Sequence, residues 1–586
     1  MLRAVSHRHR LSTGISDDLR VSRSFQSCLA QRLHSEPEGR ALTVLHRREP
    51  AAWLSFGELH QNAARYASIL SQQGVGRGDV CVIVLPSDAF ACTVLLAVLL
   101  NGSIPLLVSP PVIRGLHSNL KDVLRHVIDK TDARLVIAAD EDHELGKEMA
   151  DEVESTRFLF GAGAFAGGDA GSLVPVLPDP SAIVAMQLTS GTTGFPRICV
   201  WRQSQVLAAL DGMAAAMQIV DDDVCLNWTP LYHDMGLVNN FFLCMTQGVP
   251  LALLRTMDFL RKPAAWLQGL SDTGATITWA PNFGFAVAAQ RSREKDLEGV
   301  RLEGVKGFWN AAERIHLETM EAFHRRLEPY GLTRQALKTN FGCAENVGGA
   351  TFSDPKGHFV YERLDRSSLH QGIAIPAEDS DDVAGTVAVV SAGRPYPGMT
   401  IKIWSDDGDE LPDGHVGHLI LDTPSRMDSY LADPNETSEA LPKGLLRTGD
   451  TAYQRNGELF WVGRSRERIN LHGKKYDPSD FESVLLGVDG LREGCFAAFG
   501  VDDVSRGTQR LVLVSELRLA SADRAAAVEE EIRERVVLEV GVSVDEILLL
   551  PQGTMTKTSS GKRRHKAYRK LYLDNDLQSL AYGSGE

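Results

Sequence analysis

Residues 188–197 read LTSGTTGFPR, a cluster of Thr, Ser and Gly that follows an apolar stretch and ends in Pro196 and Arg197. Glycine lets the backbone after a strand aim several N–H groups at one point, and the hydroxyls add donors, so this composition suits a polyphosphate. It is not a Walker A loop, and the other candidate, SSGKRR, has Thr556 in place of the first glycine and Arg563 in place of Ser or Thr. We therefore predict a phosphate-binding loop at 188–197, whose alternative is an ordinary surface turn.

The segments on both sides of this loop alternate between short β-branched runs and longer helical patterns. Upstream, VCVIVL at 80–85 precedes an apolar helical segment from Ala89, and RLVIAA at 134–139 follows HSNLKDVLRHVI. Such alternation is typical of βαβ units and a mostly parallel sheet. It repeats downstream, where SQVLAALDGMAAAMQI predicts a helix, VCLNW a strand and FFLCMTQGV another helix. We therefore expect an α/β fold with two wound sheets.

The sequence pattern changes after about residue 385. Turn-rich strands with Asp-Gly signals predict a β-rich, barrel-like subdomain. Beyond it, further strands and the long segment ADRAAAVEEEIRERVVLEV predict a compact α/β domain of ordinary size. The predicted organisation is a flexible extension at 1–22, a large domain at 23–463 and a small C-terminal domain at 464–586.

Composition narrows the class of protein. The 586 residues carry a net charge of -15 and are 43% hydrophobic, which is typical of a globular protein and disfavours general binding to nucleic acid or anionic membranes. Eight cysteines occur singly, without zinc-type spacing, so no metal cage is predicted. No apolar stretch is long enough for a membrane span, and we expect a cytoplasmic protein.

Six further motifs accompany the loop in order along the chain. They are TPLYHDMGLV at 229–238, NAAERI at 310–315, FGCAENVGG at 341–349, LLRTGDTAY at 445–453, GRSRERINLHGKKYDPSDFE at 463–482 and TKTSSGKRRHK at 556–566. Together with the loop, this series resembles the adenylate-forming superfamily, which includes acyl-CoA synthetases, fatty acyl-AMP ligases and peptide-synthetase adenylation domains. The resemblance covers nearly the whole chain from about residue 25.

Within that superfamily the chain most resembles the fatty acyl-AMP ligases. DFLRKPAAWL, APNFGFA, YGLTRQALKTNFGCAE and VSAGRPYPG carry the likeness, as does the segment at about 354–384, where that family has an insertion. Two features depart from the family pattern, because FGCAEN replaces the more usual YGLAE and Arg197 replaces a lysine. The resemblance implies formation of acyl-AMP from ATP and a hydrophobic carboxylic acid, with Mg²⁺ and release of pyrophosphate. It further implies acyl transfer to the phosphopantetheine thiol of an acyl carrier protein, with coenzyme A as the alternative acceptor.

The resemblance assigns roles to individual residues. Glu345 is expected to bind Mg²⁺, with Thr193 near the metal or the phosphates, because hard oxygen donors suit that ion. Asp450 is expected to accept hydrogen bonds from both ribose hydroxyls, Arg464 to reach the ribose or phosphate, and Phe341 to stack on the adenine. The other nucleotide-binding candidates are Thr189, Ser190, Gly191, Thr192 and Gly194 in the loop, then Asn310, Ala311, Ala312, Glu313, Asn340, Gly342, Cys343 and Ala344.

Catalysis is expected to need positive charge, because ATP and a carboxylate are both anions. Lys562 matches the mobile lysine that bridges the acyl carboxylate and the α-phosphate, and Arg466 matches the hinge at which the small domain rotates between two half-reactions. Arg197 and His233 are further catalytic candidates, although a lone histidine is more often structural. The acyl-pocket candidates are Trp228, Met235, Asn282 and Phe283.

Two other functions are alternatives to the activation of a hydrophobic carboxylic acid. Asp234 leaves amino-acid activation open, because peptide-synthetase domains hold the substrate ammonium with an aspartate in this neighbourhood. A non-catalytic acyl- or nucleotide-binding subunit is a second alternative, which Glu345, Asp450 and Lys562 disfavour. The basic residues after Lys562 are expected in a solvated tail or a carrier-docking patch; they are Arg563, Arg564, Lys566, Arg569 and Lys570.

Overall fold

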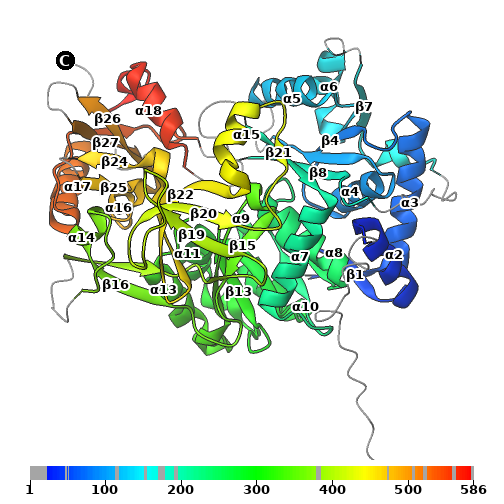
Figure 1. Cartoon of the computed structure of the whole chain (residues 1–586), viewed down its shortest axis with the longest axis horizontal. Coiled ribbons are helices and arrows are strands. Elements are labelled where there is room, and N and C mark those ends of the chain that lie inside the picture. Colours follow the sequence, from blue (N-terminus) through cyan, green and yellow to red (C-terminus); the bar gives the residue numbers. More distant parts are fainter. Residues whose placement is uncertain are drawn as a thin grey trace, which may run out of the picture.

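The structure is a computed structural model of the chain, shown in Figure 1. It describes residues 23–46, 49–50, 52–111, 118–150, 153, 155–168, 179–189, 196–377, 385–471, 474–503, 508–518, 524–556 and 563–582. The predicted extension at 1–22 lies outside these residues, as do positions 190–195 of the predicted phosphate loop and Lys562.

The first wound sheet surrounds the predicted loop. Its strand order is β21-β9-β8-β5-β4-β6-β7, and β8, β5, β4, β6 and β7 run parallel. The bounds are β4 Val80–Val84, β5 Ile104–Leu107, β6 Leu135–Ala138, β7 Arg157–Phe160, β8 Ile183–Leu188, β9 Ile198–Arg202 and β21 Ser429–Tyr430. The apolar segment predicted as a helix is α4, Ala89–Leu100, whose residues from Ala91 to Leu99 are all buried. Its first turn is capped by Asp88, which accepts a hydrogen bond from the Ala91 N–H at 2.9 Å.

The second wound sheet holds the motifs downstream of the loop. Its order is β18-β15-β14-β13-β12-β10-β11-β1-β2, with β1 and β10 to β14 parallel. The bounds are β1 Arg40–His46, β2 Glu49–Pro50, β10 Cys225–Asn227, β11 Leu251–Leu254, β12 Ile277–Pro281, β13 Gly307–Ala311, β14 Leu337–Cys343, β15 Gly348–Phe352 and β18 Arg394–Pro395. One hydrophobic cluster draws on both sheets, with Ile83 and Ala185 from the first and Leu251 and Trp279 from the second. The main core therefore lies between them, around α7, Gln203–Met217.

The predicted α/β class with two wound sheets is confirmed, and one predicted element differs in form. The segment FFLCMTQGV was expected to begin a helix, but the wider π-helical turns start earlier, at Met235–Phe242, and are followed by α8, Leu243–Gln247. π-Helical turns are frequent near functional sites. Here they begin directly after His233 and Asp234, two of the residues singled out in the sequence.

The β-rich region contains an antiparallel sheet of β19 Thr400–Trp404, β20 Gly417–Asp422, β22 Leu446–Arg455 and β23 Glu458–Arg464. Beside it lies a two-stranded unit of β16 Tyr361–Asp365 and β17 Thr386–Val390, with the short helix α14, Arg366–His370, after β16. Leu364 and Leu369 from this unit pack with Tyr453 and Phe460 of the sheet. The described part of the predicted insertion is thus attached to the β-rich subdomain.

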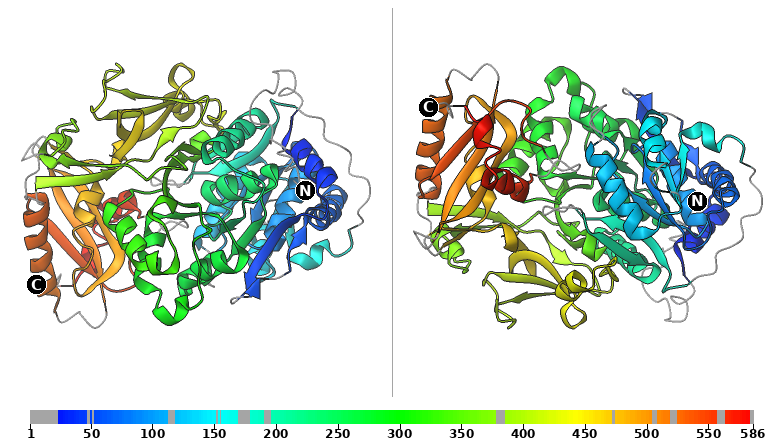
Figure 2. Two further views of the ribbon diagram at one scale, coloured as in Figure 1. Left: turned by 90° about the horizontal axis from the view of Figure 1, so that it is seen from below. Right: turned by 90° about the horizontal axis from the view of Figure 1, so that it is seen from above.

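The small C-terminal domain stands at the opposite end of the molecule from the amino-terminal segments (Figures 1 and 2). Its sheet is β26-β27-β28, with bounds β26 Leu491–Asp503, β27 Thr508–Leu517 and β28 Glu546–Leu550. Phe496 and Ala498 pack on the face that carries α17, Ala525–Val540, whereas Ala497 and Phe499 pack toward α18, His565–Leu573. This alternation is the strand period of two, and it gives the domain a core on each face of the sheet. The boundary at 463/464 stays a prediction.

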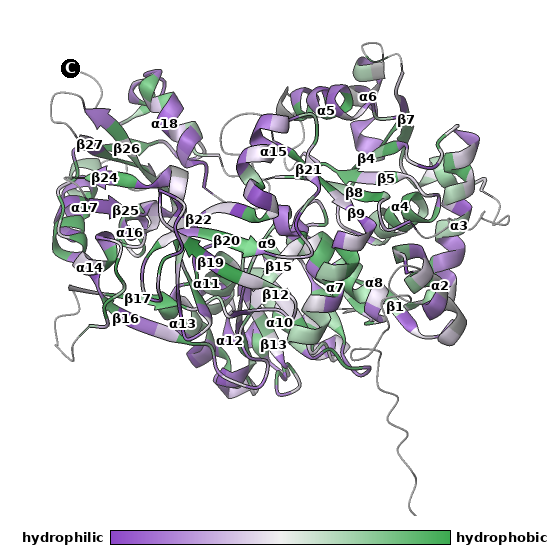
Figure 3. Ribbon diagram, viewed as in Figure 1, coloured by the Kyte–Doolittle hydropathy of each residue, from purple (hydrophilic) through white to green (hydrophobic). Residues whose placement is uncertain are grey.

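Hydrophobic residues are concentrated in the strands and in enclosed helices such as α4 (Figure 3). All eight cysteines are buried and carry free thiols. Among the described residues, no helix has the length and apolar character needed to cross a membrane.

Candidate active site

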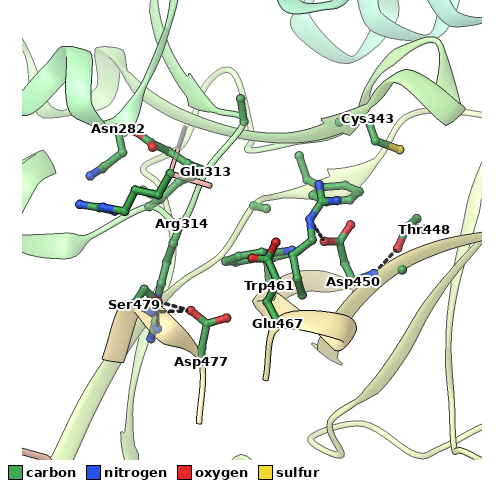
Figure 4. Close-up of a pocket in the computed structure, with 18 of the residues that line it drawn as sticks. Asn282, Glu313, Arg314, Cys343, Thr448, Asp450, Trp461, Glu467, Asp477 and Ser479 are labelled. Atoms are coloured by element: carbon green, nitrogen blue, oxygen red, sulfur yellow. Dashed lines mark hydrogen bonds and ion pairs between the residues drawn. The ribbon is translucent and has the colours of Figure 1, made fainter. Parts of the chain in front are cut away.

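A cavity of about 740 Å³ lies where the large and small domains meet (Figure 4). Its walls come from both wound sheets, from the β-rich subdomain and from the start of α18. The sequence-predicted candidates on the wall are Thr189, Arg197, His233, Asn282, Phe283, Ala312, Glu313, Asn340, Phe341, Gly342, Cys343, Ala344, Glu345, Asp450 and Arg464. The structure therefore gathers into one place residues that are far apart in the sequence.

The predicted phosphate loop connects two antiparallel strands, β8 and β9. The Thr189 N–H donates to the Arg197 carbonyl at 2.9 Å and so closes the base of the loop. Thr189 and Arg197 both line the cavity. The candidates between them, Ser190, Gly191, Thr192, Thr193 and Gly194, fall outside the described residues.

Glu345 lies in a short turn, Ala344–Asn346, after the end of β14. Its backbone carbonyl accepts a hydrogen bond from the Met427 N–H at 2.7 Å, and its carboxylate Oε1 accepts one from the Tyr430 hydroxyl at 2.6 Å. The side chain is 12% exposed, and the Arg197 Nη2 lies 3.8 Å from the same Oε1. The carboxylate predicted to bind a metal ion is thus fixed in place on the cavity wall.

Arg197 contacts protein groups in addition to facing the cavity. Its Nη1 donates to Glu436 Oε2 at 2.7 Å, and its guanidinium lies over the Tyr430 ring at 4.2 Å from the ring centroid. Both partners lie in or beside α15, Pro434–Ala440, and β21. Sequence reasoning missed Tyr430 and Glu436, since no local pattern relates them to a loop more than 200 residues away.

The ends of β12, β13 and β14 form the floor of the cavity. Parallel strands present their carboxyl ends at one edge of a sheet, which is the usual position of ligand sites in such folds. Ala312, just beyond β13, has a φ of +71°, and Phe341 on β14 is partly exposed. Asn310 and Ala311 are buried behind the wall, where the Asn310 amide donates to Asn282 Oδ1 at 3.0 Å. Glu313 accepts the Phe283 N–H at 2.6 Å and holds the start of α11, Asn282–Arg291.

Asp450 and Arg464 were assigned separately from the sequence but form a pair. They are directly opposite on the neighbouring strands β22 and β23, and the Arg464 Nε lies 3.1 Å from Asp450 Oδ1. Asp450 is 1% exposed, and its charge raises the pKa of Arg464. Arg466 follows in the turn Ser465–Glu467, between two residues of the cavity wall, Arg464 and Glu467.

His233 and two acyl-pocket candidates differ in their surroundings. The His233 Nδ1 lies 2.7 Å from Asp234 Oδ1, and both residues line the cavity. Trp228 and Met235 are buried in the hydrophobic clusters, and among the described residues neither lies on the cavity wall. The Trp228 ring stacks on Phe259 with centroids 3.7 Å apart. Asn282 and Phe283 do reach the cavity, one turn before Ala286 and Val287 on the same helix.

The small-domain wall is built from alternating charges. The His565 Nε2 lies 2.6 Å from Glu482 Oε1, and its Nδ1 lies 3.2 Å from Glu467 Oε2. Although burial opposes the charge, the two carboxylates raise the pKa of His565 to about 10. Arg563 pairs with Glu482 at 3.1 Å, so this residue of the expected basic patch takes part in a partly enclosed ion pair.

Two further buried contacts join the domains. Arg314, in the NAAERI motif, contacts Asp480 Oδ1 at 2.9 Å and donates to Ser479 at 2.8 Å, both in α16, Pro478–Glu482. Although burial opposes it, Arg314 lowers the pKa of Asp480. From α14, His370 lies 3.5 Å from Asp480 Oδ2 and packs against the Tyr476 ring at 4.1 Å. The predicted insertion therefore contacts the small domain directly.

Comparison with known proteins defines the class to which this fold and site belong. The family model described as AMP-binding enzyme matches residues 29–431, and the chain belongs to this family. The predicted resemblance to adenylate-forming ligases is thereby confirmed.

Particular relatives narrow the class. The chain is 31% identical over 428 residues to the long-chain-fatty-acid–AMP ligase FadD26 of Mycobacterium marinum, covering 69% of this chain and 72% of that protein. It is 26% identical over 600 residues to a protein of Mycobacterium tuberculosis named "putative fatty-acid–CoA ligase fadD25", covering 96% of this chain and 99% of that protein. These relatives confirm that the chain is an enzyme of the acid–thiol ligase type.

Solved structures confirm the fold. A fatty acyl-adenylate ligase from a study of the Escherichia coli and Legionella pneumophila enzymes superimposes with a TM-score of 0.88 at 24% identity, covering 94% of this chain and 98% of that one. McyG in complex with phenylalanyl-adenylate gives a TM-score of 0.84 at 23% identity, covering 95% and 84%.

Proposed function

We propose that the protein activates a hydrophobic carboxylic acid with ATP as acyl-AMP, releases pyrophosphate, and passes the acyl group to the phosphopantetheine thiol of an acyl carrier protein. The observation that carries this proposal is the common cavity, which collects Glu345, Asp450 and Arg563 from both domains. The names of the relatives, fatty-acid–AMP and fatty-acid–CoA ligases, support a fatty acid as the substrate class.

The nucleotide end of the site is proposed to lie at β14 and β22. Asp450 offers two carboxylate oxygens to a ribose, and Arg464 pairs with it at 3.1 Å. Phe341 provides a partly exposed ring on the cavity wall for the adenine. The loop closed by Thr189 and Arg197 is proposed to surround the phosphates.

Glu345 fits the requirements of a magnesium ion. Mg²⁺ usually binds through one or two carboxylates together with the substrate phosphates, not within a cage built by the protein alone. Within the described ranges, no group of three or more His, Cys, Asp or Glu side chains could form such a cage. Glu345 supplies a single anchored carboxylate on the cavity wall. When bound, the ion would supply charge that relieves repulsion between the two anionic substrates.

Lys562 is proposed to bring the catalytic positive charge. The residues that follow it closely, Arg563, His565 and Lys566, line the cavity. Because charge stabilisation of this kind is worth about 10²–10³ in rate, Lys562→Ala is expected to lower ATP–pyrophosphate exchange by at least that order. Near-normal exchange in the variant would remove Lys562 from the mechanism.

The acceptor thiol is proposed to belong to a carrier protein, because the insertion contacts the small domain. His370 packs against Tyr476 and lies beside Asp480, and a rotation of the small domain would have to break these contacts. Coenzyme A is the second candidate, supported by the relative named as a CoA ligase. A side-by-side transfer assay with holo-carrier and coenzyme A decides between them, and efficient thioester formation with coenzyme A alone would overturn the preference.

The acid itself is tested by a pyrophosphate-release screen over carboxylic acids of graded length and ring content. We expect the largest rates with long-chain acids, because Phe283, Ala286 and Val287 present an apolar helix face to the cavity. Pyrophosphate release with amino acids alone would favour amino-acid activation, with Asp234 holding the substrate ammonium. No release with any acid, together with retained ATP binding, would favour a non-catalytic subunit.

A further inference from the structure

Two groups of Tyr, Glu and Arg occur in the structure with similar chemistry. In the first, at the cavity, the Tyr430 hydroxyl donates to Glu345 at 2.6 Å while the Arg197 guanidinium covers the Tyr430 ring. In the second, away from the cavity, the Tyr453 hydroxyl donates to Glu362 at 2.9 Å while the Arg455 guanidinium lies over the Tyr453 ring. We call these the cavity group and the β-rich group.

The two groups differ in where the arginine places its charge. In the β-rich group, Arg455 Nη1 donates directly to the Glu362 carboxylate at 2.8 Å. In the cavity group, Arg197 Nη2 stays 3.8 Å from Glu345. A fourth residue causes the difference, because Glu436 accepts a hydrogen bond from Arg197 Nη1 at 2.7 Å. Glu345 therefore has a hydroxyl partner but no direct arginine hydrogen bond among the described residues.

The backbone holds the three side chains of the cavity group and Glu436 in this arrangement. β21, which carries Tyr430, pairs with β9, directly after Arg197. The Tyr430 N–H donates to Thr437 Oγ1 at 3.0 Å in α15, the helix that also carries Glu436. The Met427 N–H, three residues before Tyr430, binds the Glu345 carbonyl. One segment, 427–437, thus fixes Glu345, Tyr430 and Glu436 relative to one another.

We propose that Tyr430 and Glu436 are positioning residues for a divalent cation at Glu345, a step that rests on the proposed function of that carboxylate. The Tyr430 hydroxyl holds Oε1, which fixes the orientation of the carboxylate, so that Oε2 would be available to the cation. Glu436 holds Arg197 at an ion-pair distance of 3.8 Å from Glu345 and so keeps it from the direct hydrogen bond that would compete with the cation. Hydrogen bonds to a ligating carboxylate and the control of nearby charge both tune metal affinity.

The test of Tyr430 is a binding titration without turnover. Mn²⁺, which has a spectroscopic signal, is titrated into the full-length protein with α,β-methylene-ATP and no acid, and free Mn²⁺ is measured by electron paramagnetic resonance. Tyr430→Phe is expected to bind Mn²⁺ roughly 10–100-fold more weakly than wild type. Tyr453→Phe is the matched control, because it removes the same hydroxyl–carboxylate contact away from the cavity, and it is expected to bind normally.

The outcomes separate this inference from the proposed function. Wild-type affinity in Tyr430→Phe, or equal losses in both phenylalanine variants, would overturn the role of Tyr430. Failure of wild type to bind Mn²⁺ with the nucleotide, or undiminished binding by Glu345→Gln, would instead overturn the proposed role of Glu345.

A double-mutant cycle tests Glu436. Glu436→Gln is expected to weaken Mn²⁺ binding by about tenfold, because a neutral amide holds Arg197 less strongly. Arg197 then moves from its ion-pair distance into a direct hydrogen bond with Glu345, which must break before the cation binds. In an Arg197→Met background the competing guanidinium is absent, so the same Glu436→Gln change is expected to have no effect. An equal loss in both backgrounds, or no loss in the first, would overturn the role of Glu436.

Discussion

The cavity group and the β-rich group contain the same three residue types, yet they leave their carboxylates in different electrostatic states. Glu362 accepts hydrogen bonds from both Tyr453 and Arg455 on one oxygen, so its charge is paired. Glu345 receives only the hydroxyl as a direct hydrogen bond, while Arg197 donates to Glu436 and stays at the longer ion-pair distance of 3.8 Å from Glu345. We therefore expect the Tyr453–Glu362 contact to contribute to stability and the Tyr430–Glu345 contact to contribute to ligand binding, because the two arginines have different partners.

The arginines of the two groups also differ in how far their side chains are exposed to solvent. Arg197 is 38% exposed and faces the cavity, whereas Arg455 is 22% exposed and also donates to the Ala374 carbonyl. Burial raises the pKa of both tyrosines, with their glutamates adding to the effect. Both hydroxyls therefore stay protonated donors, and neither group changes through its tyrosine at neutral pH.

The largest effect is expected from removing the two carboxylate charges. Glu345→Gln should lower pyrophosphate release with a responsive acid by roughly 10²–10³-fold, because the charge proposed to hold the cation is lost. Glu362→Gln should leave the rate within a factor of about three and instead lower the free energy of unfolding by about 1–3 kcal/mol, since Arg455 loses a charged partner. Comparable losses of rate in the two variants would show that Glu345 and Glu362 do not differ in function.

A smaller effect is expected on the magnesium requirement. At fixed ATP, the Mg²⁺ concentration for half-maximal pyrophosphate release should rise roughly 10-fold or more in Tyr430→Phe. The rate at saturating Mg²⁺ should stay close to that of wild type, because the variant keeps Glu345. A lower saturating rate at an unchanged Mg²⁺ requirement would place Tyr430 outside the metal site.

The arginines should differ in their contribution to stability. Arg455→Met leaves Glu362 without its cation in a mostly enclosed site and is expected to cost about 2 kcal/mol in urea unfolding. Arg197→Met should cost less than about 1 kcal/mol, because Glu436 is one-third exposed and water can replace its partner. A larger loss from Arg197 than from Arg455 would contradict the assignment of the β-rich group to stability.

A third carboxylate, Glu482, has a histidine, His565, as its partner, and this partner can lose its charge as the pH rises. Because the pKa of His565 is raised to about 10 from 6.5, the folded state holds its proton more tightly than the unfolded state. The stabilisation is therefore complete below about pH 6.5 and is lost as the pH rises toward 10, with a limiting slope of about 1.4 kcal/mol per pH unit. Urea unfolding at several pH values measures this slope.

The control for that measurement lies on the same helix. Arg569, on α18, pairs with Asp502 at 3.0 Å and donates to the Gly500 carbonyl away from the described cavity wall. Arg569→Gln should lower stability at every pH without changing the slope, whereas His565→Gln should flatten it. An unchanged slope in His565→Gln would show that another group carries the pH dependence.

Much of the fold was predictable because its signals are local. The alternation of runs such as 80–85 and 134–139 with helical segments predicted strands and helices that the structure contains. The position of a residue next to a motif did not reliably predict whether its side chain faces the cavity. Trp228 precedes the TPLYHDMGLV motif, but its ring packs on Phe259 and Trp266. The π-helical turns at Met235–Phe242 were missed because their spacing departs from the 3.6-residue period.

Site residues that belong to a local sequence motif could be predicted. Contacts between residues that are distant in the sequence could not. Glu345, Asp450 and Arg464 were named from their motifs and line the cavity. Their partners were not named. The Tyr430–Glu345 contact spans 85 positions and the Arg197–Glu436 contact 239, and the chain brings such residues together only after both sheets have formed.

The burial of all eight cysteines has a practical consequence for following the reaction. Burial raises the pKa of Cys343, the cysteine on the cavity wall, and keeps its sulfur in the less nucleophilic thiol form. A chromogenic disulfide reagent added to the native protein should therefore report almost only the acceptor thiol, against a low background. For the same reason, one cysteine introduced on the surface of α18 and another on α5, Ser118–Thr131, would accept a fluorophore pair without removal of the natural cysteines.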